Sequence, residues 1–116
     1  MLTVLEAAQL PLDTKRIFIV KGNKNETRGR HAHRHVTQYL VCVHGKCRVL
    51  CDDGANKKIF ELTDTTHALL LPPGIWAEQT YLEQESTLMV VCDALYDEAD
   101  YIRDYNVFLQ SRLEKK

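Results

Sequence analysis

The sequence predicts an all-β fold, an antiparallel barrel or sandwich, that ends in one short α-helix. Six short runs alternate β-branched or aromatic residues with others and are bounded by Gly, Pro, Asn or Asp. Many short strands at regular spacing are typical of a sandwich or small barrel. With 116 residues, the chain has room for one core, so we expect a single domain over 1–116, with strands over about 15–93 and a helix over about 97–113.

The strand-like runs follow one another closely along the chain. They are KRIFIVKG (15–22), HVTQYLVCVHG (35–45), KCRVLCDDG (46–54), KKIFELT (57–63), THALLLPPG (66–74) and STLMVVCDA (86–94). The Asp-Gly pair before Ala55 predicts a hairpin turn in which Gly54 supplies a positive φ. His44 and Gly45 mark a second tight turn, so we expect the strands around these turns to form a stack of hairpins.

The period of the apolar residues changes after Asp93. From residue 97 onward, apolar side chains recur at helical spacing. Acidic residues come first and basic residues last, as the helix dipole prefers. We therefore expect one helix that packs on the β-domain or on a partner subunit; its apolar residues are Ile102, Tyr105, Phe108, Leu109 and Leu113, and its charged ends are Asp97, Glu98 and Asp100, then Arg112, Lys115 and Lys116.

Charge and composition argue against several partners. Fifteen basic and sixteen acidic residues give a net charge of −1, so no general field would hold a nucleic acid or an anionic membrane. The first ten residues, MLTVLEAAQL, contain an acid and no basic region, which argues against a signal peptide. No apolar run reaches membrane-spanning length. We expect a cytoplasmic protein with neither nucleic acid nor membrane as partner.

The four cysteines are interpreted as small buried apolar side chains. Three of them lie in strand-like segments and none forms a CxxC pair; they are Cys42, Cys47, Cys51 and Cys92. A chain without an export signal is not expected to oxidise them, and the spacing does not fit a structural zinc site.

The stretch RGRHAHRHVTQ, residues 28–38, is the main candidate site. His31 and His33 are two positions apart, so on a strand both imidazoles leave the same face and can converge on one point. Arg28 and Arg30 precede them, and the two arginines are in register with His31 only if the strand is bulged at Gly29. Arginine suits a diphosphate because its guanidinium forms two parallel hydrogen bonds. His35 is expected to be solvated.

The histidine pair resembles the first motif of the cupin superfamily, whose fold is a small antiparallel jelly-roll β-barrel. In metal-binding cupins HxH is followed by a carboxylate, and here Gln38 stands at that position. Ala77 stands where the second motif has its last imidazole. Two imidazoles, an amide and a methyl group do not complete a metal shell, so we expect neither a metal nor a cofactor. The imidazoles are then available for proton transfer near neutral pH.

Four stretches in order narrow the resemblance to the sugar-nucleotide 3,4-ketoisomerases, the WxcM-like group. They are RGRHAHRHVTQ, CDDGANKKIFEL, LLLPPGIWAE and YDEADYIRDYNVFL. The resemblance implies an enzyme that moves the keto group of a dTDP-4-keto-6-deoxyhexose from C4 to C3, through an enediol, for deoxyamino sugar biosynthesis. It also implies a homodimer that needs no metal.

The resemblance and the chemistry together suggest roles for seven side chains. One imidazole removes the C3 proton and a second group returns a proton at C4. We prefer His33 as the base and His31 as its partner. Arg28 and Arg30 would hold the diphosphate and Gln38 would line the site, whereas Trp76 would pack beside the sugar or base, with core packing as its alternative. Glu78 would orient a histidine or bind a sugar hydroxyl.

Two departures from the family pattern leave other functions open. Ala77 replaces a His or Arg of the family, and the chain is short before Arg16. The alternatives are a cupin that binds a nucleotide sugar without converting it, and an enzyme of the dTDP-sugar 3,5-epimerase type.

Overall fold

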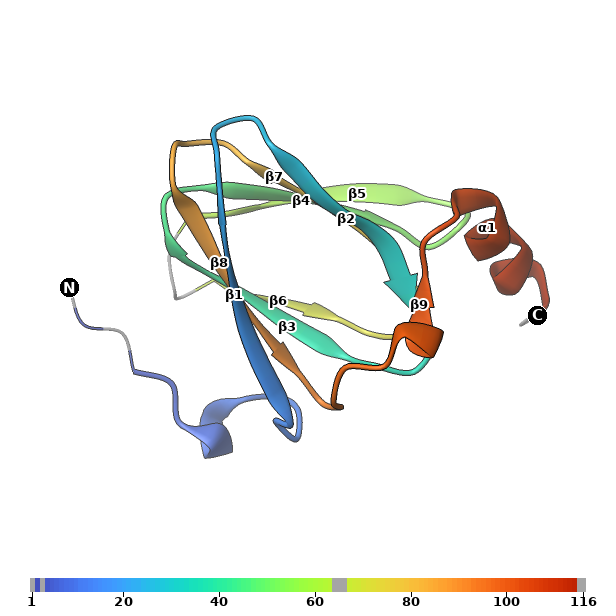
Figure 1. Ribbon diagram of the computed structural model, residues 1–116, viewed down its shortest axis with the longest axis horizontal. Helices are drawn as coiled ribbons and strands as arrows, with labels where there is room; N and C mark the ends of the chain where they lie inside the picture. Colours follow the sequence, from blue (N-terminus) through green and yellow to red (C-terminus); the bar gives the residue numbers. More distant parts are fainter. Residues whose placement is uncertain (1, 3, 64–66, 115–116) are drawn as a thin grey trace.

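The computed structural model describes residues 2, 4–63 and 67–114, which form two antiparallel β-sheets packed face to face (Figure 1). One sheet has the order β1-β8-β3-β6 and the other β5-β4-β7-β2-β9. The strands are β1 (Arg16–Gly22), β2 (Thr27–His33), β3 (Gln38–His44), β4 (Cys47–Asp52), β5 (Lys57–Leu62), β6 (Leu69–Leu71), β7 (Trp76–Tyr81), β8 (Ser86–Cys92) and β9 (Tyr101–Ile102).

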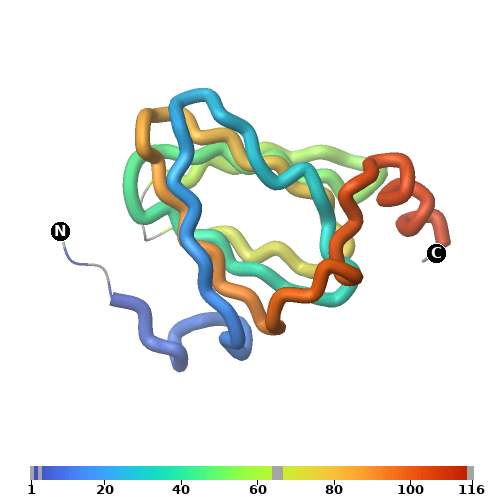
Figure 2. The backbone as a smooth tube through the Cα atoms, in the orientation of Figure 1, coloured from blue at the N-terminus to red at the C-terminus, as the bar shows by residue number. Residues whose placement is uncertain are grey.

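The predicted all-β fold is confirmed, but the sheets do not close into a barrel. Each sheet keeps two edges, β1 and β6 in one and β5 and β9 in the other. β6 has three residues and β9 two, too few to bridge from one sheet to the next. The backbone trace in Figure 2 shows the two layers and the N-terminal segment, which runs away from them.

The core lies between the sheets because alternate residues of each strand point inward. In β8 the inward residues Leu88 and Val90 are 2% and 5% exposed, and they pack with Leu40 of β3 and Val49 of β4. The middle strand β8 pairs with β1 on one side and β3 on the other. This pairing fixes the face that Arg16, at the start of β1, presents to the interior.

Both predicted turns exist, but one connects different sheets. Gly54 has φ +95 between β4 and β5, which form the predicted hairpin. Gly45 has φ +78, yet β3 and β4 lie in opposite sheets, so the expected stack of hairpins is wrong. β7 follows Gly74 and is absent from the six predicted runs, because its inward residues Ala77 and Gln79 break the apolar alternation.

The C-terminal helix α1 (Tyr105–Glu114) begins later than the predicted residue 97. Residues 98–100 form a short 3₁₀ turn, η2, capped by the Asp97 carboxylate, and β9 then pairs with the end of β2. Sheet pairing and this cap outweigh the helical spacing that includes Ile102. A second 3₁₀ turn, η1 (Ala7–Gln9), precedes β1. The predicted basic end at Lys115 and Lys116 lies outside the described residues.

Helix α1 covers the outer face of the five-stranded sheet near β2 and β9. Phe108 is fully buried there against Ala32, Trp76 and Ile102. Arg112 donates a 3.0 Å hydrogen bond to the Gly74 carbonyl. The helix therefore ties the loop before β7 to the strand that carries the histidines.

The interpretation of the cysteines as buried apolar side chains is confirmed for three of the four. Cys42, Cys47 and Cys92 are buried, Cys51 is half-buried, and all four are free thiols. Within residues 2, 4–63 and 67–114, no helix has the length and apolar character needed to cross a membrane.

Candidate functional site

A β-bulge in β2 places Arg28 and His31 on the same inward face. Arg28 pairs with Gln79 of β7 and His31 pairs with Ala77, and the register shifts between Gly29 and His31. Gly29 has φ +88, and a Cβ there would overlap the Gln79 side-chain oxygen. Glycine is therefore required at this bulge. This is the condition under which the sequence places the arginine beside the histidines.

A cavity of about 220 Å³ opens between the two sheets at this face. His31 and Gln38 form part of its wall, with Tyr101 beside them. Three guanidinium groups line it, from three separate segments of the chain: Arg16, Arg28 and Arg103. These side chains can bind an anionic group of a ligand in the cavity that His31 also lines.

His31 presents a neutral imidazole to this cavity. Its Nδ1 lies 3.1 Å from the Gly29 carbonyl oxygen, which can only accept, so Nδ1 carries the proton and Nε2 keeps its lone pair. Burial, with the nearby His33 as the next cause, lowers the pKa of His31 from 6.5 to about 4. At neutral pH this imidazole is in the form that accepts a proton.

His33 lies next to His31 and is held by a buried carboxylate. The two rings meet edge to face with centroids 5.1 Å apart. His33 Nδ1 donates to Asp100 Oδ2 at 2.9 Å, and Asp100 Oδ1 accepts the His35 backbone N–H at 2.7 Å. Burial lowers the pKa of His33, and the hydrogen bond to Asp100 opposes that shift. Its Nε2 is buried without a hydrogen-bond partner.

A small cavity of about 10 Å³ joins the two imidazoles. It is lined by His31, His33, Gln38 and Ala77, together with apolar residues of the loop before β7. Gln38 is buried, and its Nε2 lies 3.5 Å from Cys92 Sγ. The space left by the Ala77 methyl group therefore lies directly beside the histidine pair.

Three of the predicted substrate-binding residues lie away from this cavity. Arg30 is the extra residue of the bulge, with φ +58 and an exposed side chain. Trp76 and Glu78 lie on the outer face of β7, because that face alternates with the one that carries Ala77. Trp76 is 5% exposed, packs against Phe108 and donates a 3.0 Å hydrogen bond to Glu78 Oε2. Trp76 thus takes the core position that was its alternative, and Glu78 holds the indole rather than a histidine.

Sequence reasoning missed the groups that β9 contributes. Tyr101 pairs with His33 across the strands, and its ring lies 4.4 Å from the His33 ring and 5.0 Å from the His31 ring. The Arg103 guanidinium lies 4.3 Å from the Tyr101 ring centroid, and its Nε is 2.7 Å from Glu98 Oε1. Both residues lie in the stretch DYIRDY, which the sequence pattern assigned to the predicted helix.

The donor set does not fit a tightly bound metal. Gln38 and Ala77 stand beside the two imidazoles, as the sequence indicates, where a metal site would need further donors. Over the residues that the structure describes, no three His, Cys, Asp or Glu side chains gather into a group that could hold a metal ion.

Acid should destabilise the protein through His31. Its pKa is lower in the folded state than in the unfolded state, so the unfolded chain binds the proton first and stability falls from about pH 6.5 towards pH 4. We expect a loss of about 1–2 kcal/mol between pH 7 and pH 5 from this residue. Urea unfolding at both pH values should show a smaller loss for His31→Gln. The exposed His44→Gln is the control, and equal losses in all three proteins would contradict the assignment.

The family model and the known protein that this chain matches point to the same kind of protein. The family model described as "FdtA: WxcM-like, C-terminal" matches residues 1–113. The chain is 35% identical over 109 residues to the TDP-4-oxo-6-deoxy-alpha-D-glucose-3,4-oxoisomerase of Aneurinibacillus thermoaerophilus, covering 93% of this chain and 78% of that protein.

Solved structures of ketoisomerases share the fold. The 3,4-ketoisomerase QdtA from Thermoanaerobacterium thermosaccharolyticum, in complex with TDP, is 29% identical with a TM-score of 0.90, over 97% of this chain and 83% of that chain. A 3,4-ketoisomerase from Helicobacter canadensis is 29% identical with a TM-score of 0.89, over 97% and 86% of the two chains.

Proposed function

The chain belongs to the FdtA family of WxcM-like C-terminal domains, and we propose that it is a sugar-nucleotide 3,4-ketoisomerase acting on a dTDP-4-keto-6-deoxyhexose. The observation that carries the proposal is His31 at a cavity lined by three arginines, with the His33 ring against it and Asp100 hydrogen-bonded to His33. The relative from Aneurinibacillus thermoaerophilus carries the name of this activity.

The geometry supports His31, rather than His33, as the group that faces the substrate. His31 borders the larger cavity and has a free Nε2, whereas His33 Nε2 is enclosed. This reverses the order preferred from the sequence. In the proposed first step, His31 Nε2 takes the proton from C3, the C3–H electron pair forms the C3–C4 double bond, and the C4 carbonyl oxygen takes up a proton.

The second half of the reaction returns a proton to carbon. The enediol loses the proton of its C3 oxygen, which becomes the new carbonyl, and C4 receives a proton from the imidazolium. His33 is proposed to carry the proton between the two oxygens through Nε2, which has no hydrogen-bond partner in the protein, at the small cavity that it shares with His31, while Asp100 holds Nδ1. The net change is an isomerisation that needs no oxidant and no added cofactor.

Arg28 is proposed to bind the diphosphate, with Arg16 and Arg103 at the same cavity. Replacing Arg28 by Ala should weaken binding of free dTDP about 10- to 100-fold, because a charge-assisted hydrogen bond contributes about 1.5–3 kcal/mol. Isothermal titration with dTDP measures this directly. Arg30→Ala is the matched control, since Arg30 lies two residues away on the exposed bulge. Equal weakening by both substitutions would contradict the assignment.

A test of the activity itself is incubation with dTDP-4-keto-6-deoxyglucose in deuterated water, followed by NMR. An isomerase gives a 3-keto product with deuterium at C4. An epimerase of the 3,5 type would keep the 4-keto group and place deuterium at C3 and C5, and a binding protein would leave the sugar unchanged.

A homodimer is part of the proposal. β1 is an edge strand, and its outward residues Ile17 and Ile19 are 54% and 64% exposed. Apolar residues on an unpaired edge favour burial against a second copy. Light scattering should give twice the chain mass at micromolar concentration, and a monomer mass would contradict it. The cytoplasmic location expected from the sequence stays a prediction.

A further inference from the structure

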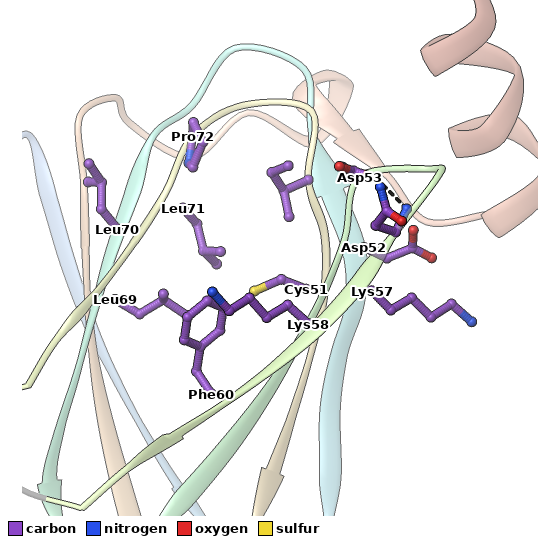
Figure 3. A pocket seen from close by; sticks show the side chains of 12 residues that line it. Cys51, Asp52, Asp53, Lys57, Lys58, Phe60, Leu69, Leu70, Leu71 and Pro72 are labelled. Atoms are coloured by element: carbon purple, nitrogen blue, oxygen red, sulfur yellow. Dashed lines mark hydrogen bonds between the residues drawn. The ribbon is translucent and has the colours of Figure 1, made fainter.

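A second cavity lies on the other side of the sandwich, away from the arginines. It measures about 320 Å³, which is larger than the 220 Å³ of the arginine-lined cavity. It opens between β5 and β6, the edge strands of the two sheets (Figure 3). Its volume falls in the range of small-molecule sites. Neither histidine of the proposed site lines it.

The floor of this cavity is apolar. Phe60 comes from β5, Leu69 and Leu71 come from β6, and Ile75 comes from the loop before β7. Figure 3 shows the Cys51 sulfur among these side chains. Burial raises the pKa of Cys51 to about 11, so its thiol is neutral and adds to the apolar surface.

Two carboxylates and two lysines lie at the rim, and the carboxylates already accept hydrogen bonds from the protein. Asp52 is engaged by the Gly54 N–H and the Tyr105 hydroxyl, and Asp53 accepts the N–H groups of its own turn. The Lys58 ammonium, by contrast, lies over the cavity wall, 5.1 Å from the Phe60 ring centroid. Lys57 precedes it on β5 and also lines the cavity, but Figure 3 shows its side chain pointing away from the apolar floor.

From this distribution, we propose that the cavity binds a small amphipathic anion, with an apolar body on the Phe60, Leu69 and Leu71 floor and its acidic group at Lys58. The apolar floor supplies the burial, and the ammonium selects a carboxylate, sulfonate or phosphate. The site is independent of the proposed isomerase activity.

A bound anion would also press on a wall shared with the histidines. Leu71, Pro72 and Ile75 line both this cavity and the small cavity between His31 and His33. Occupancy is therefore expected to shift the imidazole signals in a histidine NMR spectrum, even in the absence of a sugar nucleotide.

The probe for the test is 8-anilinonaphthalene-1-sulfonate, whose fluorescence rises in an apolar site. Saturable binding is expected to persist with the arginine-lined cavity filled by excess dTDP. Lys58→Met keeps the aliphatic stem and should weaken binding about threefold. Lys58→Arg should restore it. Lys21→Met, on an exposed position of β1, is the control.

Three results would overturn the proposal. They are competition between the probe and dTDP, equal binding by Lys58→Met and Lys21→Met, and a change in molecular mass when the probe binds. The last result would mean that a second copy covers the groove. Leu69→Trp should fill the cavity and abolish binding; if it does not fold, the Lys58 series decides. None of these measurements depends on turnover. Failure of the isomerase proposal would therefore leave this proposal intact, and failure of this one would leave the isomerase proposal intact.

Discussion

Replacing His31 by Asn should lower kcat/KM for isomerisation about 100- to 10,000-fold, the usual contribution of a general base. The amide cannot accept the C3 proton at neutral pH, whereas the imidazole is neutral because burial lowers its pKa to about 4. Binding of free dTDP should change by less than about threefold, since the guanidinium groups at the cavity do not act through His31. Steady-state kinetics and a dTDP titration separate the two effects.

The companion variant His33→Asn tests which of the two histidines removes the C3 proton. If His33 carries the proton between oxygens, its loss should also slow turnover but leave exchange of the C3 proton with solvent measurable. His44→Asn, exposed at the end of β3, is the matched control. Normal exchange and turnover in His31→Asn, with both lost in His33→Asn, would restore the order preferred from the sequence. Full activity in both variants would contradict proton transfer by this pair.

The same low pKa should appear in the pH dependence of His31-catalysed turnover. An ordinary histidine base would lose activity below about pH 6.5, whereas a base with a pKa about 4 stays deprotonated at pH 5. The acid limb of kcat/KM for the wild-type protein should therefore lie closer to pH 4 than to pH 6.5.

Local sequence patterns predicted most of the strands and the histidine pair of the site. Alternation in β1, β3, β4, β5, β6 and β8 follows from burial of one face, so these strands could be predicted from the sequence. The family predicted from four ordered stretches is confirmed by the match over residues 1–113. The HxH spacing predicted that His31 and His33 share a cavity, because it depends only on the two-residue strand period.

The missing half of the site depends on pairing between distant segments. Asp100 is 67 residues from His33, and no local pattern brings a carboxylate to an imidazole across that separation. Arg16 and Arg103 reach the cavity from β1 and from the segment after β9. Trp76 was placed at the mouth because an indole suits a sugar, but the β7 register turns it outward under α1.

The apparent helix over residues 97–104 illustrates the same limit. Tertiary pairing of β9 with β2 overrides the helical spacing there, and it does so at the residues that serve the site. Asp100 closes η2, its carboxylate faces His33, and its backbone carbonyl accepts the Arg34 N–H at 2.9 Å. A helix through this segment would remove the carboxylate from the histidine.

Asp100→Asn should therefore cost both activity and stability. An Asn Nδ2 would donate to His33 Nδ1 and reverse the tautomer, so Nε2 would carry the proton and the imidazolium would lose its counterion. We expect kcat to fall about 10- to 100-fold, and the free energy of unfolding to fall by about 1–3 kcal/mol because a buried charge-assisted hydrogen bond is replaced by a weaker neutral one. Kinetics and urea unfolding measure the two losses.

If Asp100 had only a structural role, Asp100→Asn would lower stability without changing the tautomer of His33. Nitrogen-15 NMR of the histidine rings reads this directly: the wild-type protein should show a protonated Nδ1, and Asp100→Asn should show a protonated Nε2. Asp97→Asn, which changes the nearby cap of η2 but does not touch His33, is the matched control for folding. If Asp100→Asn keeps the wild-type tautomer and kcat while stability falls, Asp100 only anchors the loop, and the proposed positioning of His33 is wrong.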